Sequence, residues 1–144
     1  MRLHLCRPTL LHTSHIPEQA APQGAVGVLD SLKFDARTGR QIWEYQRQPA
    51  LQKGPNRGVA VYGNKVFMGT PDAHLVALDA RTGSELWATK IAETSDGYWS
   101  PAAPLVIKGK VIQGIAPGDH GLNGFLDAYD AETGERLWRW HAIP

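Results

Sequence analysis

The sequence predicts an all-β fold that forms part of a β-propeller, with about two and a half four-stranded blades. The main observation is a unit that occurs three times: an apolar residue, then Asp-Ala-x-Thr-Gly, three further residues and Trp. The copies span 34–43, 78–87 and 129–138, and their aspartates are 44 and 51 residues apart. Repeats of this period that contain short strands are typical of propeller blades.

Each copy of the unit is expected to form a tight turn between two antiparallel strands. Asp and Thr side chains hydrogen-bond the backbone of their own turn, and Gly adopts positive φ there without steric cost. Hydrophobic residues flank the turn, as in a hairpin. We expect Trp43, Trp87 and Trp138 to pack between neighbouring blades, with each indole N–H bonded locally. One copy per repeat favours this structural role over stacking on a cofactor.

The strands are predicted from short apolar runs between turn signals. The expected bounds are 31–35 and 40–46 in a half blade, then 59–62, 65–70, 74–78 and 84–90, then 103–107, 110–115, 124–129 and 135–140. Glycine-containing turns join such strands as antiparallel hairpins, and four up-and-down strands make one blade. The predicted organisation is therefore a half blade over 28–46 and full blades over 58–90 and 102–142.

Residues 1–27 match neither a strand nor a helix period. We interpret them as an irregular leader to the propeller segment 28–144. Whether the leader is native stays open, because a truncated reading frame would leave the same pattern. No secretory apolar core of about 7–15 residues is visible near Met1.

Composition argues against several classes of function. Fifteen basic and 14 acidic residues leave a net charge of +1, which favours neither nucleic acid nor an anionic membrane as a partner. The single cysteine, Cys6, permits no internal disulfide. No apolar run approaches the roughly 18 residues of a membrane helix.

The second full blade carries an insertion between its second and third strands. Lys65 precedes Asp79 by 14 positions, whereas Lys110 precedes Asp130 by 20. The six extra residues lie within 116–123, a stretch rich in turn formers that also contains an acid.

The inserted loop and the links between blades are expected at one end of the sheets. Connections alternate between two ends in an up-and-down sheet, and the links 46–58 and 91–101 are long while the other turns are minimal. We call this the long-loop end. Loops that exceed what a fold requires are where binding residues concentrate, so the site is predicted there.

Five segments carry a resemblance to a known family: 56–60, 72–80, 96–98, 102–106 and 124–131. Together they resemble the early blades of the PQQ-dependent (quinoprotein) alcohol dehydrogenases, where PQQ is pyrroloquinoline quinone. The resemblance runs over roughly 28–144. The repeated unit resembles the tryptophan docking motif of this family, which non-enzymatic propellers share.

The resemblance implies an eight-bladed propeller with PQQ on its axis and Ca²⁺ beside it. It implies that Arg57 contacts the cofactor, that Gly118 lies against it, and that Asp119 ligates calcium where the family usually has Glu. A guanidinium pairs well with the carboxylates of PQQ, and calcium prefers carboxylate oxygens. The ion would act as a Lewis acid on the quinone carbonyl. The catalytic base of the family belongs to a later blade, so no catalytic residue is assigned here.

Four positions depart from the family pattern. Leu51 and Gln52 stand where many members have adjacent cysteines, Pro101 stands at a Thr and Ala116 at a Ser. These departures favour a second hypothesis, a non-catalytic PQQ-like propeller scaffold that resembles the outer-membrane assembly lipoprotein. The acidic insertion favours the enzyme, since a scaffold needs no metal loop.

The leading hypothesis is a fragment of a PQQ- and calcium-dependent alcohol dehydrogenase. Such an enzyme oxidises a primary alcohol or similar substrate and passes electrons to cytochrome c or a membrane quinone. The resemblance implies a periplasmic or membrane-associated location.

Each of these residues also has a purely structural interpretation. Arg57 would otherwise be a solvated loop residue, and Asp119 would otherwise cap its turn. His74 is expected to be an ordinary strand residue. The isolated chain is expected to be inactive and to associate, because an open stack of blades exposes apolar faces.

Overall fold

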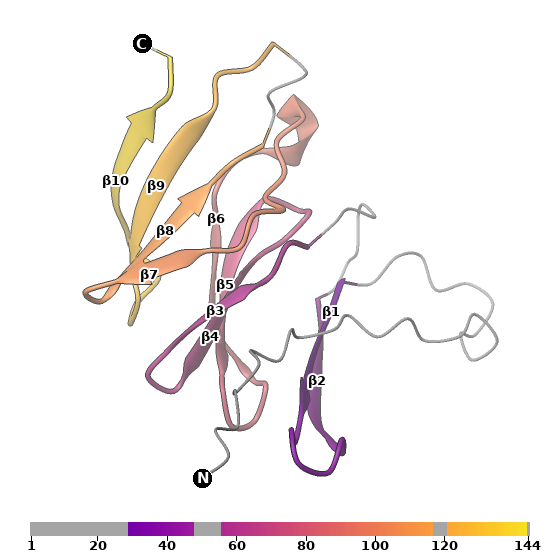
Figure 1. The fold of residues 1–144 in the computed structure, drawn as a ribbon. Helices are drawn as coiled ribbons and strands as arrows, with labels where there is room; N and C mark the ends of the chain where they lie inside the picture. The colour runs from indigo at the N-terminus through magenta and orange to yellow at the C-terminus, as the bar shows by residue number, and fades with distance from the viewer. Residues whose placement is uncertain (1–28, 48–55, 117–120, 144) are drawn as a thin grey trace, which may run out of the picture.

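The computed structural model describes residues 29–47, 56–116 and 121–143 and contains three antiparallel sheets (Figure 1). The first sheet pairs β1 (Leu29–Phe34) with β2 (Gln41–Arg47). The second contains β3 (Val59–Tyr62), β4 (Lys65–Gly69), β5 (His74–Asp79) and β6 (Glu85–Lys90). The third contains β7 (Leu105–Ile107), β8 (Lys110–Gly114), β9 (Phe125–Asp130) and β10 (Arg136–His141). A short 3₁₀ helix, η2 (Thr94–Asp96), lies in the link between the second and third sheets.

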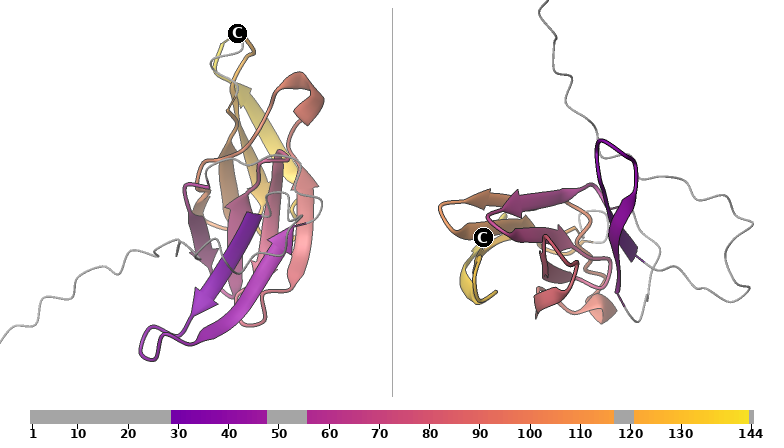
Figure 2. Two further views of the ribbon diagram at one scale, coloured as in Figure 1. Left: turned by 90° about the vertical axis from the view of Figure 1, so that its right-hand side faces the viewer. Right: turned by 90° about the horizontal axis from the view of Figure 1, so that it is seen from below.

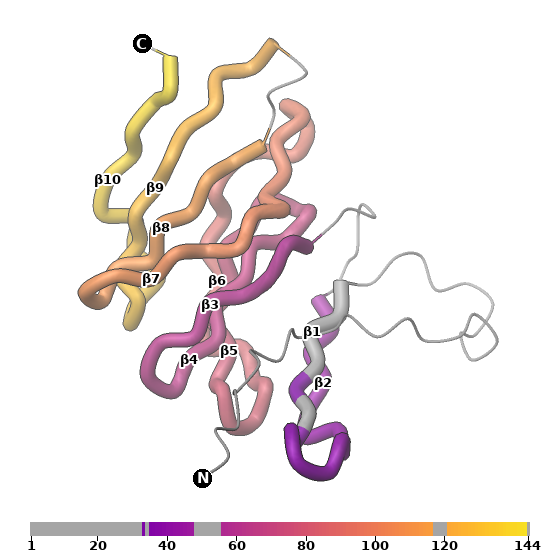
Figure 3. The backbone as a smooth tube through the Cα atoms, viewed as in Figure 1, coloured from indigo at the N-terminus to yellow at the C-terminus, as the bar shows by residue number. Residues whose placement is uncertain are grey.

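Both four-stranded sheets are simple meanders in which each strand pairs with the next along the chain. Figures 1 and 3 show the three sheets stacked side by side, with β3–β6 in the middle, and Figure 2 gives two further views of the stack. The first strands of the two complete sheets, β3 and β7, contact each other. The prediction of an all-β, partial β-propeller fold is confirmed. No helix in the described residues is long and apolar enough to cross a membrane.

The repeated Asp-Ala-x-Thr-Gly unit forms the same turn each time. At the second copy, Asp79 Oδ1 accepts hydrogen bonds from the N–H groups of Arg81 (2.9 Å) and Thr82 (2.8 Å). Gly83 N–H donates to the Asp79 carbonyl at 2.8 Å, and its φ is +77°. The first and third copies repeat both side-chain bonds. These bonds, led by the one from the Thr82 backbone, hold the pKa of Asp79 below its usual value.

The sheets are joined by the tryptophans of the repeat, as predicted for Trp43 and Trp87. Trp43 lies against Gly83 of the next sheet, and Trp87 lies against Gly134. Trp43 Nε1 donates to the Ala80 carbonyl at 3.1 Å. Trp87 Nε1 is buried and has no partner among the described residues, so the prediction of a local bond is correct for Trp43 and wrong for Trp87. Trp138, on the last sheet, is 42% exposed.

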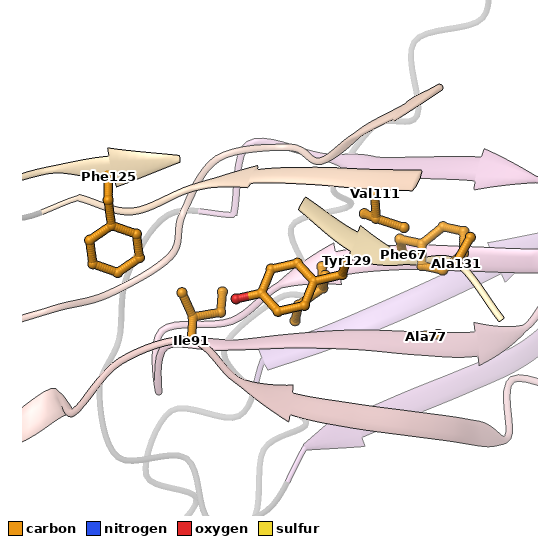
Figure 4. Close-up of a cluster of buried hydrophobic side chains, with 8 residues drawn as sticks. Phe67, Ala77, Ile91, Val111, Phe125, Tyr129 and Ala131 are labelled. Carbon is orange, nitrogen blue, oxygen red and sulfur yellow. The ribbon is translucent and has the colours of Figure 1, made fainter. Parts of the chain in front are cut away.

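Apolar side chains fill the spaces on both faces of the middle sheet. The alternation of a strand sends Phe67 toward the third sheet and sends its neighbours Val66 and Met68 toward the first. The larger cluster, seen in Figure 4, joins β4 and β5 to β8 and β9 and includes Ile91 of the link and Tyr129. Burial on two faces explains why β4 is buried along its whole length.

Candidate cofactor-binding end

The long-loop end is held together by the link that runs from the second sheet to the third. Ser100 N–H donates to the carbonyl of Thr70, just after β4, at 3.2 Å. The carbonyl of Pro101 accepts the N–H of Arg57, just before β3, at 2.9 Å. Trp99 forms an antiparallel bridge with Ala116, just after β8. One short stretch, 99–101, thus joins three chain segments that are far apart in sequence.

This arrangement places the described site positions of the sequence analysis at one end. Arg57 and Ala116 both bond the 99–101 stretch, which itself contains Pro101. Gly118 and Asp119 lie outside the described residues, as do Leu51 and Gln52. The roles predicted for Gly118 and Asp119 therefore stay predictions.

The Asn-Arg-Gly segment is shaped by its own side chains. Asn56 Oδ1 accepts the N–H of Gly58 at 2.8 Å, and Asn56 Nδ2 donates to the Gly69 carbonyl at 3.5 Å. Gly58 has a φ of +132°, which L side chains rarely adopt, and Ala103 Cβ lies 3.5 Å from where its own Cβ would be. The backbone of Arg57 is thus fixed on both sides while its side chain stays exposed.

Arg57 is the described residue that best fits a carboxylate-bearing cofactor. Its guanidinium makes no ion pair or hydrogen bond with another described residue. Arg57 lies at the long-loop end, on a backbone held by the bonds described above. A charged, planar donor of this kind suits bidentate pairing with a carboxylate. Pro101 and Ala116 contribute no side-chain donor, and the Pro101 carbonyl already accepts from Arg57. Within the described ranges, no group of three or more His, Cys, Asp or Glu side chains is placed to hold a metal.

Gln113 on β8 is a functional candidate that the sequence reasoning missed. Its side chain is fully buried. Nε2 donates to Ser100 Oγ (2.8 Å), to the Gly114 carbonyl (3.0 Å) and to the Ala102 carbonyl (3.1 Å). Comparison of the two blades could have identified it. Aligning Lys65 with Lys110 puts Gln113 at the position of Met68, which is buried, so a polar side chain stands at a core position.

A polar cluster joins the first and second sheets near the β4–β5 turn. Arg47 Nε lies 2.9 Å from Asp72 Oδ2, and His74 Nδ1 lies 3.1 Å from the same oxygen. Thr70 Oγ1 also donates to Asp72. Burial by itself would raise the pKa of Asp72, but hydrogen bonds from His74, Thr70 and Arg47 outweigh it and hold that pKa far below its usual value. His74 begins β5, as expected for a strand residue, and its ring also lies 2.7 Å from the Asp72 carbonyl through Nδ1.

Tyr45 and Glu85 extend the same junction between the sheets. The hydroxyl of Tyr45 donates to Glu85, which also lies 3.4 Å from Arg47 Nη1. Burial and the bond to Glu85 raise the pKa of Tyr45 to about 12. The residues of this junction all have structural partners, so we assign it no binding role.

The link after β6 and parts of β9 and β10 line a hollow of about 540 Å³. Arg139 lies 3.5 Å above the Phe125 ring, and it pairs with buried Asp127 through Nε (2.8 Å) and Nη2 (2.7 Å). Its Nη2 also donates to the Ile91 carbonyl of the interblade link at 2.9 Å. The Arg139–Asp127 pair thus joins β10 to β9 within the third sheet, and the bond to Ile91 joins that sheet to the link.

The fold is a propeller of the quinoprotein type, as shown by the stacked meanders, the contacts of Trp on Gly between sheets, and the long-loop end. A PQQ-repeat family model, described as outer membrane protein assembly factor BamB, matches residues 30–139. The quinohemoprotein alcohol dehydrogenase of Comamonas testosteroni is 45% identical over 119 residues, which cover 77% of this chain and 17% of that protein. The chain belongs to the PQQ-dependent (quinoprotein) alcohol dehydrogenase family.

Solved structures agree with this assignment. The crystal structure of the Comamonas enzyme matches with a TM-score of 0.71 at 42% identity, over 77% of this chain and 18% of that one. A europium-containing methanol dehydrogenase matches with a TM-score of 0.71 at 34% identity, over 81% of this chain and 23% of that one. BamB from Moraxella catarrhalis matches with a TM-score of 0.55 at 26% identity, over 73% and 29%. The chain spans about a fifth of the length of its dehydrogenase relatives.

Proposed function

We propose that this chain is a segment of a PQQ- and calcium-dependent dehydrogenase that oxidises a primary alcohol or a similar substrate. Electrons would pass to cytochrome c or a membrane quinone, and the protein would act in the periplasm or at a membrane. The observation that carries the proposal is Arg57, exposed and without a carboxylate partner among the described residues, on a backbone held by the 99–101 stretch. This feature occurs in a chain that is 45% identical to a quinohemoprotein alcohol dehydrogenase.

The residues of this chain would bind and orient the cofactor. Arg57 would pair with a carboxylate of PQQ and stay charged, because a guanidinium does not lose its proton in proteins. Gly118 would let the cofactor approach the backbone, and Asp119 would supply a carboxylate oxygen to the metal. PQQ, when bound, supplies a quinone that accepts two electrons from the alcohol.

A chimaera tests this proposal. The part of this chain that matches the Comamonas enzyme, 77% of its length, would replace the corresponding segment of that enzyme. We expect the chimaera to bind PQQ in the presence of Ca²⁺ and to reduce an electron-accepting dye with a primary alcohol. Arg57→Ala should weaken PQQ binding by about 10- to 100-fold, the range for a hydrogen bond to a charged group.

Arg81→Ala is the matched control, because Arg81 is also an exposed arginine but belongs to a short turn between β5 and β6. It should leave PQQ affinity unchanged. A chimaera that melts cooperatively yet neither binds PQQ nor oxidises alcohols would refute the proposal.

A non-catalytic scaffold is the second candidate function. The match to BamB and the absence of side-chain donors at Pro101 and Ala116 favour it. Equilibrium metal binding separates the two candidates. A dehydrogenase segment in the chimaera should bind Ca²⁺ or a trivalent lanthanide and lose that binding in Asp119→Asn, whereas a scaffold should bind neither ion specifically.

A further inference from the structure

Gln113 bonds the residues on both sides of Pro101. Its Nε2 reaches Ser100 Oγ at 2.8 Å and the Ala102 carbonyl at 3.1 Å. Pro101 has no N–H, so this stretch of the link lacks one backbone donor that would otherwise hold it. The buried amide supplies from β8 the hydrogen bonds that stabilise the link at this point.

The orientation of the Gln113 amide is determined by its neighbours. Two carbonyl oxygens, of Ala102 and Gly114, lie beside Nε2, so exchanging nitrogen and oxygen would bring the amide oxygen against two groups that can only accept. In the orientation present, Oε1 is buried and has no partner among the described residues. A buried acceptor without a donor is unfavourable, and the hydrogen bonds that the two N–H groups of Nε2 make with the three neighbouring oxygens offset it. The amide is therefore retained for its N–H groups.

The link that Gln113 holds is the one that bonds Arg57. The Pro101 carbonyl accepts the Arg57 N–H at 2.9 Å, and Pro101 stands between the two residues that Gln113 contacts. Ser100 is also close-packed, since a Cβ on Gly69 would come within 2.6 Å of its carbonyl oxygen. Any loosening of 100–102 is therefore transmitted to the Arg57 backbone.

We infer that Gln113, acting through Ser100 and Pro101, is a positioning residue that sets the backbone of Arg57 at the cofactor-binding end. The structural part of this inference depends only on the described hydrogen bonds. Its consequence for cofactor affinity rests on the proposed function.

Hydrogen exchange on the 144-residue chain tests the structural part. Gln113→Met keeps the length of the side chain and removes its donors. We expect the Arg57 amide, resolved by fragmentation mass spectrometry, to exchange at least tenfold faster in this variant. Amides of the β4–β5 ladder should change much less.

Val111→Ala is the control, because Val111 is buried in the same strand but belongs to the apolar cluster. It should speed exchange across both sheets without singling out Arg57. If Gln113→Met does not fold, Ser100→Ala replaces it, because this change removes one acceptor of the same amide. The Arg57 amide should then exchange faster than the ladder amides in Ser100→Ala. An Arg57 amide that exchanges no faster than the ladder amides in the folded variant would overturn the inference.

A double-mutant cycle in the chimaera tests the consequence for PQQ. Gln113→Met should weaken PQQ binding several-fold when Arg57 is present and have almost no effect in the Arg57→Ala background, because coupled residues are not additive. Equal effects in both backgrounds would refute positioning through Arg57. If the chimaera binds no PQQ but the exchange result holds, the proposed function fails and the positioning role stands.

Discussion

The indole of Trp43 occupies the space that a side chain on Gly83 would need, since a Cβ there would lie 2.7 Å from Trp43 Cδ2. Trp87 has the same relationship to Gly134, where the distance to Cε3 would be 2.6 Å. The repeated unit therefore provides both halves of each contact between sheets. Its Trp packs on the sheet that follows, and its Gly receives the Trp of the sheet before.

Gly134→Ala is expected to lower the free energy of unfolding by about 2–4 kcal/mol, the sum of a strained positive φ and an overpacked contact. Gly109→Ala is the matched control. Its φ of +74° equals that of Gly134, but a Cβ at Gly109 would meet nothing within 4 Å. The control should cost only about 1 kcal/mol. Urea denaturation measures both, and equal losses would show that the Trp87 contact contributes little.

Acid should destabilise the junction between the first and second sheets. The folded state holds the pKa of Asp72 below that of the unfolded chain, which is about 3.9. The resulting stability is present above about pH 4 and is lost as the pH falls through the lower folded pKa. Urea midpoints measured from pH 7 to pH 3 should fall more steeply in the wild type than in Asp72→Asn.

The aspartates of the repeated turn also make stability fall with pH, but they are present in both the wild type and Asp72→Asn, so they do not affect the comparison. Asp96→Asn, a change at an exposed site, should retain the wild-type slope. Identical slopes for wild type and Asp72→Asn would contradict the assignment to Asp72.

Breaking the Arg139–Asp127 pair should be costly because Asp127 is fully buried. Arg139→Leu leaves that carboxylate without its cation and is expected to cost about 3–5 kcal/mol. The double change Arg139→Leu with Asp127→Leu should cost less than the single one, since no buried charge remains. Chemical denaturation of the three proteins checks this, and a double variant no more stable than Arg139→Leu would contradict it.

The isolated chain is expected to self-associate through the uncovered face of the third sheet. Trp138 and Trp140 alternate along β10 and so share a face, and they are 42% and 60% exposed. Adjacent exposed aromatics of this kind favour association. Sedimentation velocity should show a shift toward monomer when Trp140 is replaced by Lys. Leu86→Lys, at an exposed site on β6, should leave the distribution unchanged. A wild-type chain that is monomeric at high concentration would refute this prediction.

Much of the fold was predictable because its determinants are local. The Asp79 turn depends only on residues close to it in sequence, 79–83. The strands follow from short alternating patterns. The resemblance of the segments around Arg57 to the quinoprotein dehydrogenases was confirmed by the comparisons. The contact of Arg57 with the Pro101 carbonyl was not predictable, because it joins residues from separate loops.

The sequence by itself determined the repeated turn, the strands, the stacking of Trp on the next sheet and the family. Only the tertiary structure decided that Gln113 is buried against the link and that His74 and Arg47 both contact Asp72. It also decided that Trp87, among the described residues, lacks the N–H partner that Trp43 has. The physical reason is range. Turn chemistry and strand alternation act between neighbours in the chain, whereas the burial and bonding of a polar side chain depend on which distant segments fold against it.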